Sequence, residues 1–356
     1  MIAPLIAALA AASVMPPAGD ALLDRCAAVE RTAETARISG QYLVTDTVDD
    51  CGGLLGPVEY RTSDAPWRWA SVTKQVVAVA VMQAVEAGKV TLDTPVAAFV
   101  PALKIANSSR ITLRMLLKHA SGLPNVEDGP LDARKEMLVQ YRYDAPRAAG
   151  VSPICLGSAK AVPGARFDYN NCDTEIVGAV LEAVEHKPLA DVLYAGILAR
   201  AGMAATRLVP PGEKPTGRRG YFADGRDDGF IDIGRFGAVG AVRGPARDLA
   251  RFDRALLTDA LLKPANRAEL ERGDPKLGYA ALGVWSYTVP LKGCATPQHL
   301  VERRGEIGGV QVRNVIAPER GLALIVFTDR PFEFGEAWQG NGGSYTLFSA
   351  AFCPWR

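Results

Sequence analysis

The chain has 356 residues, of which 48% are hydrophobic, so it can bury a large core and, at roughly 100–200 residues per domain, form about two structural units. Its 40 Lys and Arg residues nearly balance its 39 Asp and Glu residues, which leaves a net charge of +1. The sequence contains no basic block and no basic patch interleaved with aromatics. Binding to nucleic acid is therefore not expected.

The N-terminal stretch from Met1 to Met15 is almost wholly apolar and is broken by Pro16 and Pro17. A run of this length is short for a membrane span, so we interpret residues 1–21 as a secretory signal peptide. No Lys or Arg precedes the run, which leaves an uncleaved N-terminal helix as the alternative. The signal peptide predicts a periplasmic or secreted protein with no stable membrane anchor after cleavage.

Short apolar runs alternate with Gly, Asp and Pro from Ile38 to Trp69, which predicts two or three antiparallel strands. The stretch from Ser71 to Ala87 is apolar on nearly all sides and indicates a buried central helix that stops at Gly88. Further helices are predicted over residues 113–118, 173–203 with a break at Pro188, 248–257 and 344–352. Further strands are predicted over residues 282–289, 309–316 and 322–328.

Strands near both ends of the chain, with helices between them, predict an α+β fold in which an antiparallel sheet is flanked by helices as an α/β sandwich. We expect residues 22–90 and 258–356 to form the sheet domain. Residues 91–257 would form an inserted, mostly helical region, with the active site in the cleft between the two units.

The six cysteines form no C-x-x-C pair, and in an exported protein their even number predicts up to three disulfides. Six cysteines allow 15 pairings, among which the sequence does not select. We expect neighbours in sequence to pair, as Cys26–Cys51, Cys155–Cys172 and Cys294–Cys353. Buried free thiols are the alternative if the chain stays in the cytoplasm.

Ser71 and Lys74 are one helical turn apart at the start of the predicted central helix. Residues at this spacing share a helix face, so the lysine amine can reach the serine hydroxyl and accept its proton. The backbone N–H of Ser71 would lie at the positive end of the helix and form one half of an oxyanion hole. A turn later in the chain presents Tyr169 and Asn171, a phenol and a carboxamide suited to proton relay and substrate binding.

Four segments in this order resemble the superfamily of class C β-lactamases, D-alanyl-D-alanine carboxypeptidases and esterases. They are residues 69–93, 111–124, 163–171 and 318–322. The resemblance runs from about residue 38 to 350 and implies a β-lactamase/transpeptidase-like fold. It also implies that Ser71 is the acyl-accepting nucleophile, Lys74 its first proton partner, Tyr169 the general base or proton shuttle, and Asn171 a ligand of the substrate's carbonyl or amide. His119, in the second segment, is expected to pack or form a turn.

The resemblance further implies a strand with Lys-Thr-Gly or His-x-Gly. Aligned on the double glycine of residues 304–309, the cationic position holds Glu306, Gly308 lies beside the substrate, and the Gly309 N–H completes the oxyanion hole. A carboxylate there would repel an anionic substrate by roughly 1–4 kcal/mol at contact distance, so we expect a neutral or amine-bearing substrate, with Glu306 paired to Lys74 or Arg304. An alignment slip, or a Glu306 turned to solvent, is the alternative.

The sequence therefore predicts an exported serine hydrolase that acts through an acyl-enzyme on an ester, amide or β-lactam bond of a small-molecule or peptide-like substrate, without a cofactor. Esterase, D-specific peptidase and β-lactamase activities all stay open, as does the oligomeric state. A catalytically silent binding or scaffold protein with the same fold is the alternative. With three histidines and no H-E-x-x-H motif, no metal site is predicted.

Overall fold

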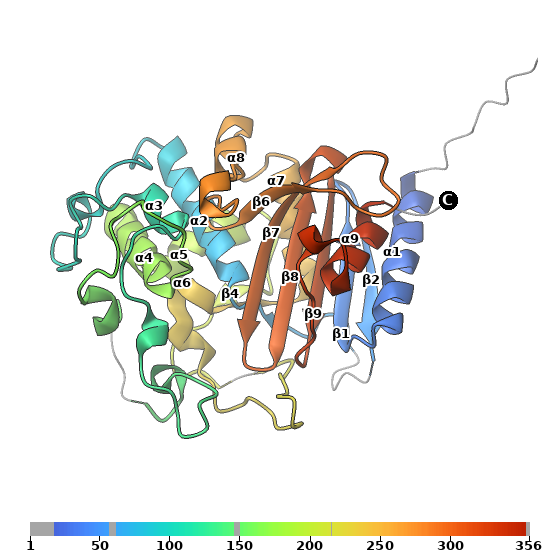
Figure 1. Ribbon diagram of the computed structural model, residues 1–356, viewed down its shortest axis with the longest axis horizontal. Helices are drawn as coiled ribbons and strands as arrows, with labels where there is room; N and C mark the ends of the chain where they lie inside the picture. Colours follow the sequence, from blue (N-terminus) through green and yellow to red (C-terminus); the bar gives the residue numbers. More distant parts are fainter. Residues whose placement is uncertain (1–17, 57–61, 146–149, 215, 354–356) are drawn as a thin grey trace, which may run out of the picture.

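A six-stranded antiparallel sheet built from both ends of the chain organises the structure (Figure 1). The computed structural model describes residues 18–56, 62–145, 150–214 and 216–353, so most of the predicted signal peptide lies outside the described residues. In spatial order the strands are β2 (Asp50–Leu55), β1 (Gly40–Thr45), β9 (Leu322–Thr328), β8 (Val310–Ala317), β7 (Gln298–Ile307) and β6 (Trp285–Val289). The pairing of β1 with β9 joins the two ends of the chain, which confirms the predicted fold class.

The sheet is covered on both faces, and the alternation of side chains along β9 shows why. Its residues are all buried, because even-numbered side chains enter one hydrophobic cluster and odd-numbered side chains enter another. Helices α1 (Ala18–Thr35) and α9 (Gly342–Phe352) cover the first face, and α7 (Ala246–Leu257) packs against β1 and β9 on the second. Helix α1 was not predicted. Within the described residues, no helix has the length and apolar character needed to cross a membrane.

Helix α2 (Val72–Glu86) is the central helix expected from the sequence, and twelve of its fifteen residues are buried. It packs against α4 (Asn171–Glu185), α6 (Gly237–Gly240) and α8 (Pro264–Leu270) and also contacts β7. Gly88 follows its end with φ +69°, the left-handed conformation that terminates many helices. The contact of α2 with β7 places the start of the helix beside the sheet.

Most of the remaining elements come from the chain between α2 and α7 and lie on the side of α2 that faces away from the large sheet (Figure 1). A small sheet contains β3 (Trp67–Arg68), β5 (Val242–Gly244) and β4 (Arg207–Leu208). Short helices and turns are α3 (Leu113–Leu117), η1 (Val96–Ala98), η2 (Val126–Asp128), η3 (Val139–Tyr141), η4 (Pro153–Leu156), α5 (Leu189–Leu193), η5 (Tyr194–Leu198), η6 (Ile233–Phe236), η7 (Pro275–Leu277), η8 (Pro318–Arg320) and η9 (Ala337–Gln339). Helix α7 crosses the expected boundary between residues 257 and 258, since it was assigned to the inserted region but packs on the sheet.

All three expected disulfides are present. Cys26–Cys51 and Cys294–Cys353 belong to the cluster beneath α1 and α9, whereas Cys155–Cys172 lies in a separate cluster near the start of α2. The prediction that sequence neighbours pair is therefore confirmed.

A buried carboxyl group lies between α7, α2 and β8. Asp253 is fully buried, and its Oδ1 accepts a hydrogen bond from Asn314 Nδ2 at 2.8 Å. The same amide donates to Gln75 Oε1 at 3.1 Å, while Asp253 Oδ2 has no partner among the described residues. Burial raises the pKa of Asp253 to about 8, although the Asn314 hydrogen bond opposes the shift. The folded protein therefore favours the neutral acid.

We expect Asp253→Asn to stabilise the protein at alkaline pH. Between roughly pH 4 and the folded pKa, the unfolded chain has released the proton of Asp253 while the folded protein still holds it. The free energy of unfolding of the wild type therefore falls by about 1.4 kcal/mol per pH unit in this range. The amide does not titrate, so its advantage should be greatest at pH 8 and should vanish near pH 4. Urea unfolding at several pH values measures the difference, and parallel pH profiles for the two proteins would contradict a neutral Asp253.

Candidate active site

Ser71 stands at a sharp turn between β3 and α2. Ala70, directly before it, is fully buried with φ +46°, a left-handed conformation that residues other than glycine avoid. Such strain persists where the surrounding core fixes it, and it is frequent at functional sites. Ser71 is the N-cap of α2, yet its side chain makes no capping hydrogen bond. The hydroxyl is therefore turned toward other partners.

Lys74 lies one turn further along α2 and reaches this hydroxyl. Its Nζ donates to Ser71 Oγ at 2.9 Å and to the carbonyl oxygen of Val239 at 2.9 Å. The side chain is 1% exposed, and burial lowers the pKa of Lys74 to about 8, with the charge of Arg303 acting in the same direction and Tyr169 opposing it. A lysine in these surroundings can lose its proton close to neutral pH.

Tyr169 is the second partner of the serine, with its Oη 2.9 Å from Ser71 Oγ. Burial alone would raise the pKa of this phenol, but the positive charges of Arg303 and Lys74 outweigh burial and lower the pKa to about 8. The ring of His119 packs edge-on against Tyr169, with 4.7 Å between ring centroids. His119 is buried with φ +53°, in agreement with the packing and turn role expected from the sequence.

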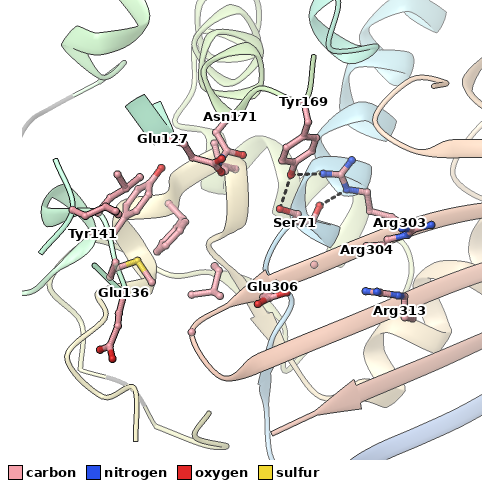
Figure 2. Close-up of a pocket in the computed structure, with 18 of the residues that line it drawn as sticks. Ser71, Glu127, Glu136, Tyr141, Tyr169, Asn171, Arg303, Arg304, Glu306 and Arg313 are labelled. Atoms are coloured by element: carbon pink, nitrogen blue, oxygen red, sulfur yellow. Dashed lines mark hydrogen bonds between the residues drawn. The ribbon is translucent and has the colours of Figure 1, made fainter. Parts of the chain in front are cut away.

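Arg303, on β7, completes this cluster, and the sequence analysis missed it. Its Nη2 donates to Tyr169 Oη at 2.8 Å and its Nε donates to the Ser71 carbonyl oxygen at 2.9 Å (Figure 2). The side chain is 1% exposed, and the guanidinium carbon lies 5.2 and 5.1 Å from the ring centroids of Tyr169 and Trp285. A permanent positive charge thus faces the phenol.

The expectation that the Glu306 side chain takes the cationic position beside the nucleophile was wrong, because Arg303 occupies that place. The cation-x-Gly pattern falls three residues earlier, at Arg303-Arg304-Gly305. Because side chains alternate along a strand, Glu306 points to the opposite face of β7 from Arg303. It is exposed at the pocket rim and accepts a hydrogen bond from Gln311 Nε2 at 3.2 Å (Figure 2).

The expected pairing of Glu306 with Lys74 or Arg304 was also wrong. Arg304 instead binds Glu302 through two hydrogen bonds and pairs with Glu336. Lys74 is on the other side of β7, where its amine donates to Ser71 and Val239. Glu306 therefore exerts no direct control over the charge of Lys74.

The predicted oxyanion donor Gly309 was wrong as well, because its N–H donates to Asp228 Oδ2 at 2.9 Å. Asp228 is buried and forms a two-point ion pair with Arg68, so this end of the β7–β8 hairpin is anchored behind the site. Gly308, with φ +58°, forms the turn and lines the pocket. Gly305 is the glycine next to Ser71, since a Cβ on it would lie 2.9 Å from the Ser71 nitrogen.

Asn171 lines the pocket, and the nitrogen of its side-chain amide already makes a hydrogen bond. Its Nδ2 donates to Glu127 Oε1 at 3.0 Å, and its buried Oδ1 has no partner within the described chain. A carboxylate only accepts hydrogen bonds, so Glu127 orients the amide with its carbonyl oxygen left unpaired. Asn125 holds the same turn, because it donates to the Tyr169 carbonyl at 3.1 Å and accepts from the Asn171 N–H at 3.1 Å.

The pocket above Ser71 has a volume of about 470 Å³. One side is apolar, where Tyr141 and Phe236 stack with 3.8 Å between centroids beside Met137 and Leu138. Glu127 is exposed on the same side, close to Asn171 (Figure 2). The pocket can therefore receive a partly apolar group next to an acidic one.

The model of a family described as Beta-lactamase matches residues 55–340 of the chain. The chain is 23% identical over 288 residues to the D-alanyl-D-alanine-carboxypeptidase/endopeptidase AmpH of Escherichia coli K12, covering 75% of this chain and 72% of AmpH. It is 30% identical over 158 residues to esterase EstB of Burkholderia gladioli, covering 39% of this chain and 38% of EstB. A Bacillus subtilis protein named as penicillin-binding protein PbpX is 26% identical over 195 residues, and the match covers 54% of this chain and less than half, 46%, of PbpX.

Among solved structures, a D-stereospecific amidohydrolase from Streptomyces sp. superposes with a TM-score of 0.75 at 22% identity, covering 93% of this chain and 99% of that one. At this identity the similarity concerns the fold. It agrees with the α+β architecture described above.

We predict that Arg303→Gln raises the pKa of Tyr169 by about one to three units, because a nearby positive charge favours the phenolate by this amount. The difference in ultraviolet absorbance between each protein and its Tyr169→Phe counterpart isolates this phenol during a pH titration. The wild-type midpoint should lie near 8. Arg303→Lys, which keeps a positive charge, is the matched control. Identical midpoints in Arg303→Gln and wild type would show that the guanidinium does not govern Tyr169.

Proposed function

Because the chain belongs to the Beta-lactamase family of serine hydrolases, we propose that Ser71 attacks the carbonyl carbon of an ester, amide or β-lactam and carries the acyl group until water releases it. The observation that carries this proposal is the single hydroxyl of Ser71 within 2.9 Å of both Lys74 Nζ and Tyr169 Oη. A serine alcohol is a weak nucleophile until a neighbouring base takes its proton. Here two candidate bases with lowered pKa values flank it.

The proton moves through Lys74 and Tyr169 as a coupled pair. As the bond between Ser71 Oγ and the carbonyl carbon forms, the pair accepts the hydroxyl proton, and it then delivers this proton to the leaving oxygen or nitrogen. In deacylation, water gives a proton to the pair, attacks the acyl carbon, and Ser71 Oγ recovers its proton. The positive charge of Arg303 lowers the pKa of both Lys74 and Tyr169. It therefore favours a state in which one of the two has lost its proton.

The oxyanion of the tetrahedral intermediate would be bound by two backbone N–H groups. The first is that of Ser71, at the start of α2. For the second we propose Glu306, whose peptide follows Gly305 on β7. The closeness of Gly305 to the Ser71 nitrogen supports this choice, and β7 has no pairing with β6 beyond Glu302, which leaves its edge open to the pocket.

We propose a neutral or amine-bearing substrate in preference to an anionic one. Two cations that line the pocket are hydrogen-bonded within the described structure, Arg303 to Tyr169 and Arg304 to Glu302 and Glu336, and Arg313 lies 3.8 Å from the carboxylate of Glu302. The carboxylate of Glu127 and the unpaired Oδ1 of Asn171 both accept hydrogen bonds, so together they suit a substrate ammonium or amide N–H. The carboxylate of a penicillin or of a peptide C-terminus would meet no comparable partner.

We also propose that the protein acts outside the cytoplasm, in the periplasm or as a secreted enzyme. Its six cysteines are all paired in disulfides, and such bonds persist in oxidising compartments. The apolar N-terminal stretch supports export.

Covalent labelling tests the nucleophile. We expect a fluorophosphonate probe to add one adduct per wild-type chain and none to Ser71→Ala, as read by intact mass spectrometry. Ser121→Ala is a useful control. Ser121 is also buried and hydrogen-bonded, but its partner is Asp173 and not Lys74 or Tyr169. A folded wild-type protein that no acylating probe or ester labels would favour a silent scaffold of the same fold.

Substrate selection can be tested with Glu127→Gln and two esters that differ only in a free or an acetylated α-amine. We expect wild type to prefer the free amine, and the variant to lose about tenfold or more in kcat/KM for that ester, since a charge-assisted hydrogen bond is worth roughly 1.5–3 kcal/mol. The acetylated ester should react at a similar rate in both proteins. Glu136→Gln is the control, because Glu136 lines the same pocket but is paired with Arg226. Equal wild-type rates on the two esters would refute the amine preference.

A further inference from the structure

The disulfide Cys155–Cys172 joins two parts of the candidate site that come from different segments of the chain. Cys172 is the second residue of α4 and directly follows Asn171. Cys155 lies in η4, at the end of a segment that we call the pocket wall, defined as residues 125–145 and 150–157. The pocket wall carries Glu127 and Tyr141, whereas α4 carries Asn171.

The bond lies within the hydrophobic cluster beneath the site. Both cysteines are fully buried. Their cluster includes Ala70, which precedes the nucleophile, and Val239, whose carbonyl accepts a hydrogen bond from Lys74. It also includes Val126, next to Glu127, and the pocket residues Tyr141 and Phe236.

The pocket wall has little regular structure to fix its position. In its described part the helical elements are three short 3-10 turns, η2, η3 and η4. Its ties to the start of α4 include the side-chain bonds of Asn125 to residues 169 and 171, the bond from Asn171 Nδ2 to Glu127 Oε1, the bond from the Ser152 N–H to Glu175 Oε2 at 2.7 Å, and the disulfide. The disulfide is the covalent one among these ties, so it limits how far the wall can move from Asn171.

The other two disulfides provide a built-in comparison. Cys26–Cys51 and Cys294–Cys353 lie in the cluster on the opposite face of the sheet, under α1 and α9. They close loops of 25 and 59 residues, whereas Cys155–Cys172 closes 17. In the chain-entropy description a longer loop gives greater stabilisation, so stability alone would make Cys155–Cys172 the least important of the three.

We propose that Cys155–Cys172 is a positioning element that makes the site competent, so that the hydrolase becomes active only once this bond has formed. This inference rests on the proposed function and adds a redox condition to it. Formation transfers two electrons and two protons from the two thiols to an external disulfide, which becomes two thiols. The chain would then stay inactive in a reducing compartment and gain activity after export.

The test compares three double variants of the full chain: C155A/C172A, C26A/C51A and C294A/C353A. For each we would measure the unfolding midpoint, the rate of Ser71 labelling by the fluorophosphonate, and kcat/KM for the free-amine and acetylated esters. We expect C155A/C172A to lose about a hundredfold or more in labelling rate, because a displacement of reacting groups by about 1 Å can cost this much. It should also lose the preference for the free amine. Glu127 lies on the pocket wall and Asn171 on α4, and the missing bond no longer holds these two parts together.

The other two variants should unfold at lower temperature but keep wild-type labelling and substrate preference below their midpoints. A folded C155A/C172A with wild-type labelling rate and preference would overturn the proposal while leaving the serine mechanism intact. An oxidised wild type that is never labelled would instead refute the proposed function, and this inference with it.

If C155A/C172A does not fold, refolding of wild type in glutathione buffers of graded redox poise replaces it. Peptide mapping identifies which disulfides have formed in each sample. Activity that rises with Cys155–Cys172 and not with the other two bonds supports the proposal. Activity that appears before this bond forms overturns it.

Discussion

The contact of a buried guanidinium with a half-buried phenol is the interaction on which the charge balance around Ser71 depends. Arg303 and Lys74 are two potential cations that are each 1% exposed, and among the described residues Tyr169 is the acidic group that accepts a hydrogen bond from Arg303. Charges in such surroundings interact strongly, so full protonation of the cluster is unfavourable. Either the lysine becomes neutral or the phenol becomes ionised, and both outcomes leave a base beside Ser71. Under the proposed mechanism, the activation of the serine thus depends on the fixed charge of Arg303.

The architecture makes this contact possible by joining distant parts of the chain. Ser71 and Lys74 come from the central helix, Tyr169 from the turn before α4, and Arg303 from a strand near the C-terminal end. The sheet pairs β1 with β9, and α2 packs against β7, so the fold carries these residues to one point. The strain at Ala70 and the bare backbone of Gly305 let the helix start lie directly against the strand.

Local patterns allowed much of this to be predicted. The buried helix, the strands at both ends and the Ser71–Lys74 and Tyr169–Asn171 pairs all depend on residues close in sequence, where spacing fixes geometry. The pairing of cysteines nearest in sequence was also correct. Helix α1 escaped notice because its place is set by packing against α9, β1 and β2, which no local pattern reveals.

The segment of β7 next to the serine was misplaced for a physical reason. Gly308-Gly309 is the more conspicuous glycine pair, but it serves the hairpin turn and the bond to Asp228, whereas the glycine that lies against Ser71 is Gly305. In the same way, the orientation of Asn171 depends on Glu127, a partner 44 residues away. Long-range partners of this kind determine charge and hydrogen-bond direction, and a single sequence does not disclose them.

Strand β7 presents Arg303, Gly305 and Ile307 to the nucleophile and Glu302, Arg304 and Glu306 to the other face. Its sequence therefore encodes two chemically opposite surfaces on alternate positions. Loss or gain of one residue within this strand would exchange them and place a long charged side chain where Gly305 now lies against Ser71. The strand should thus accept many point changes on its outer face during evolution, yet it should keep its length, because its register is as much a part of the active site as any side chain that it carries.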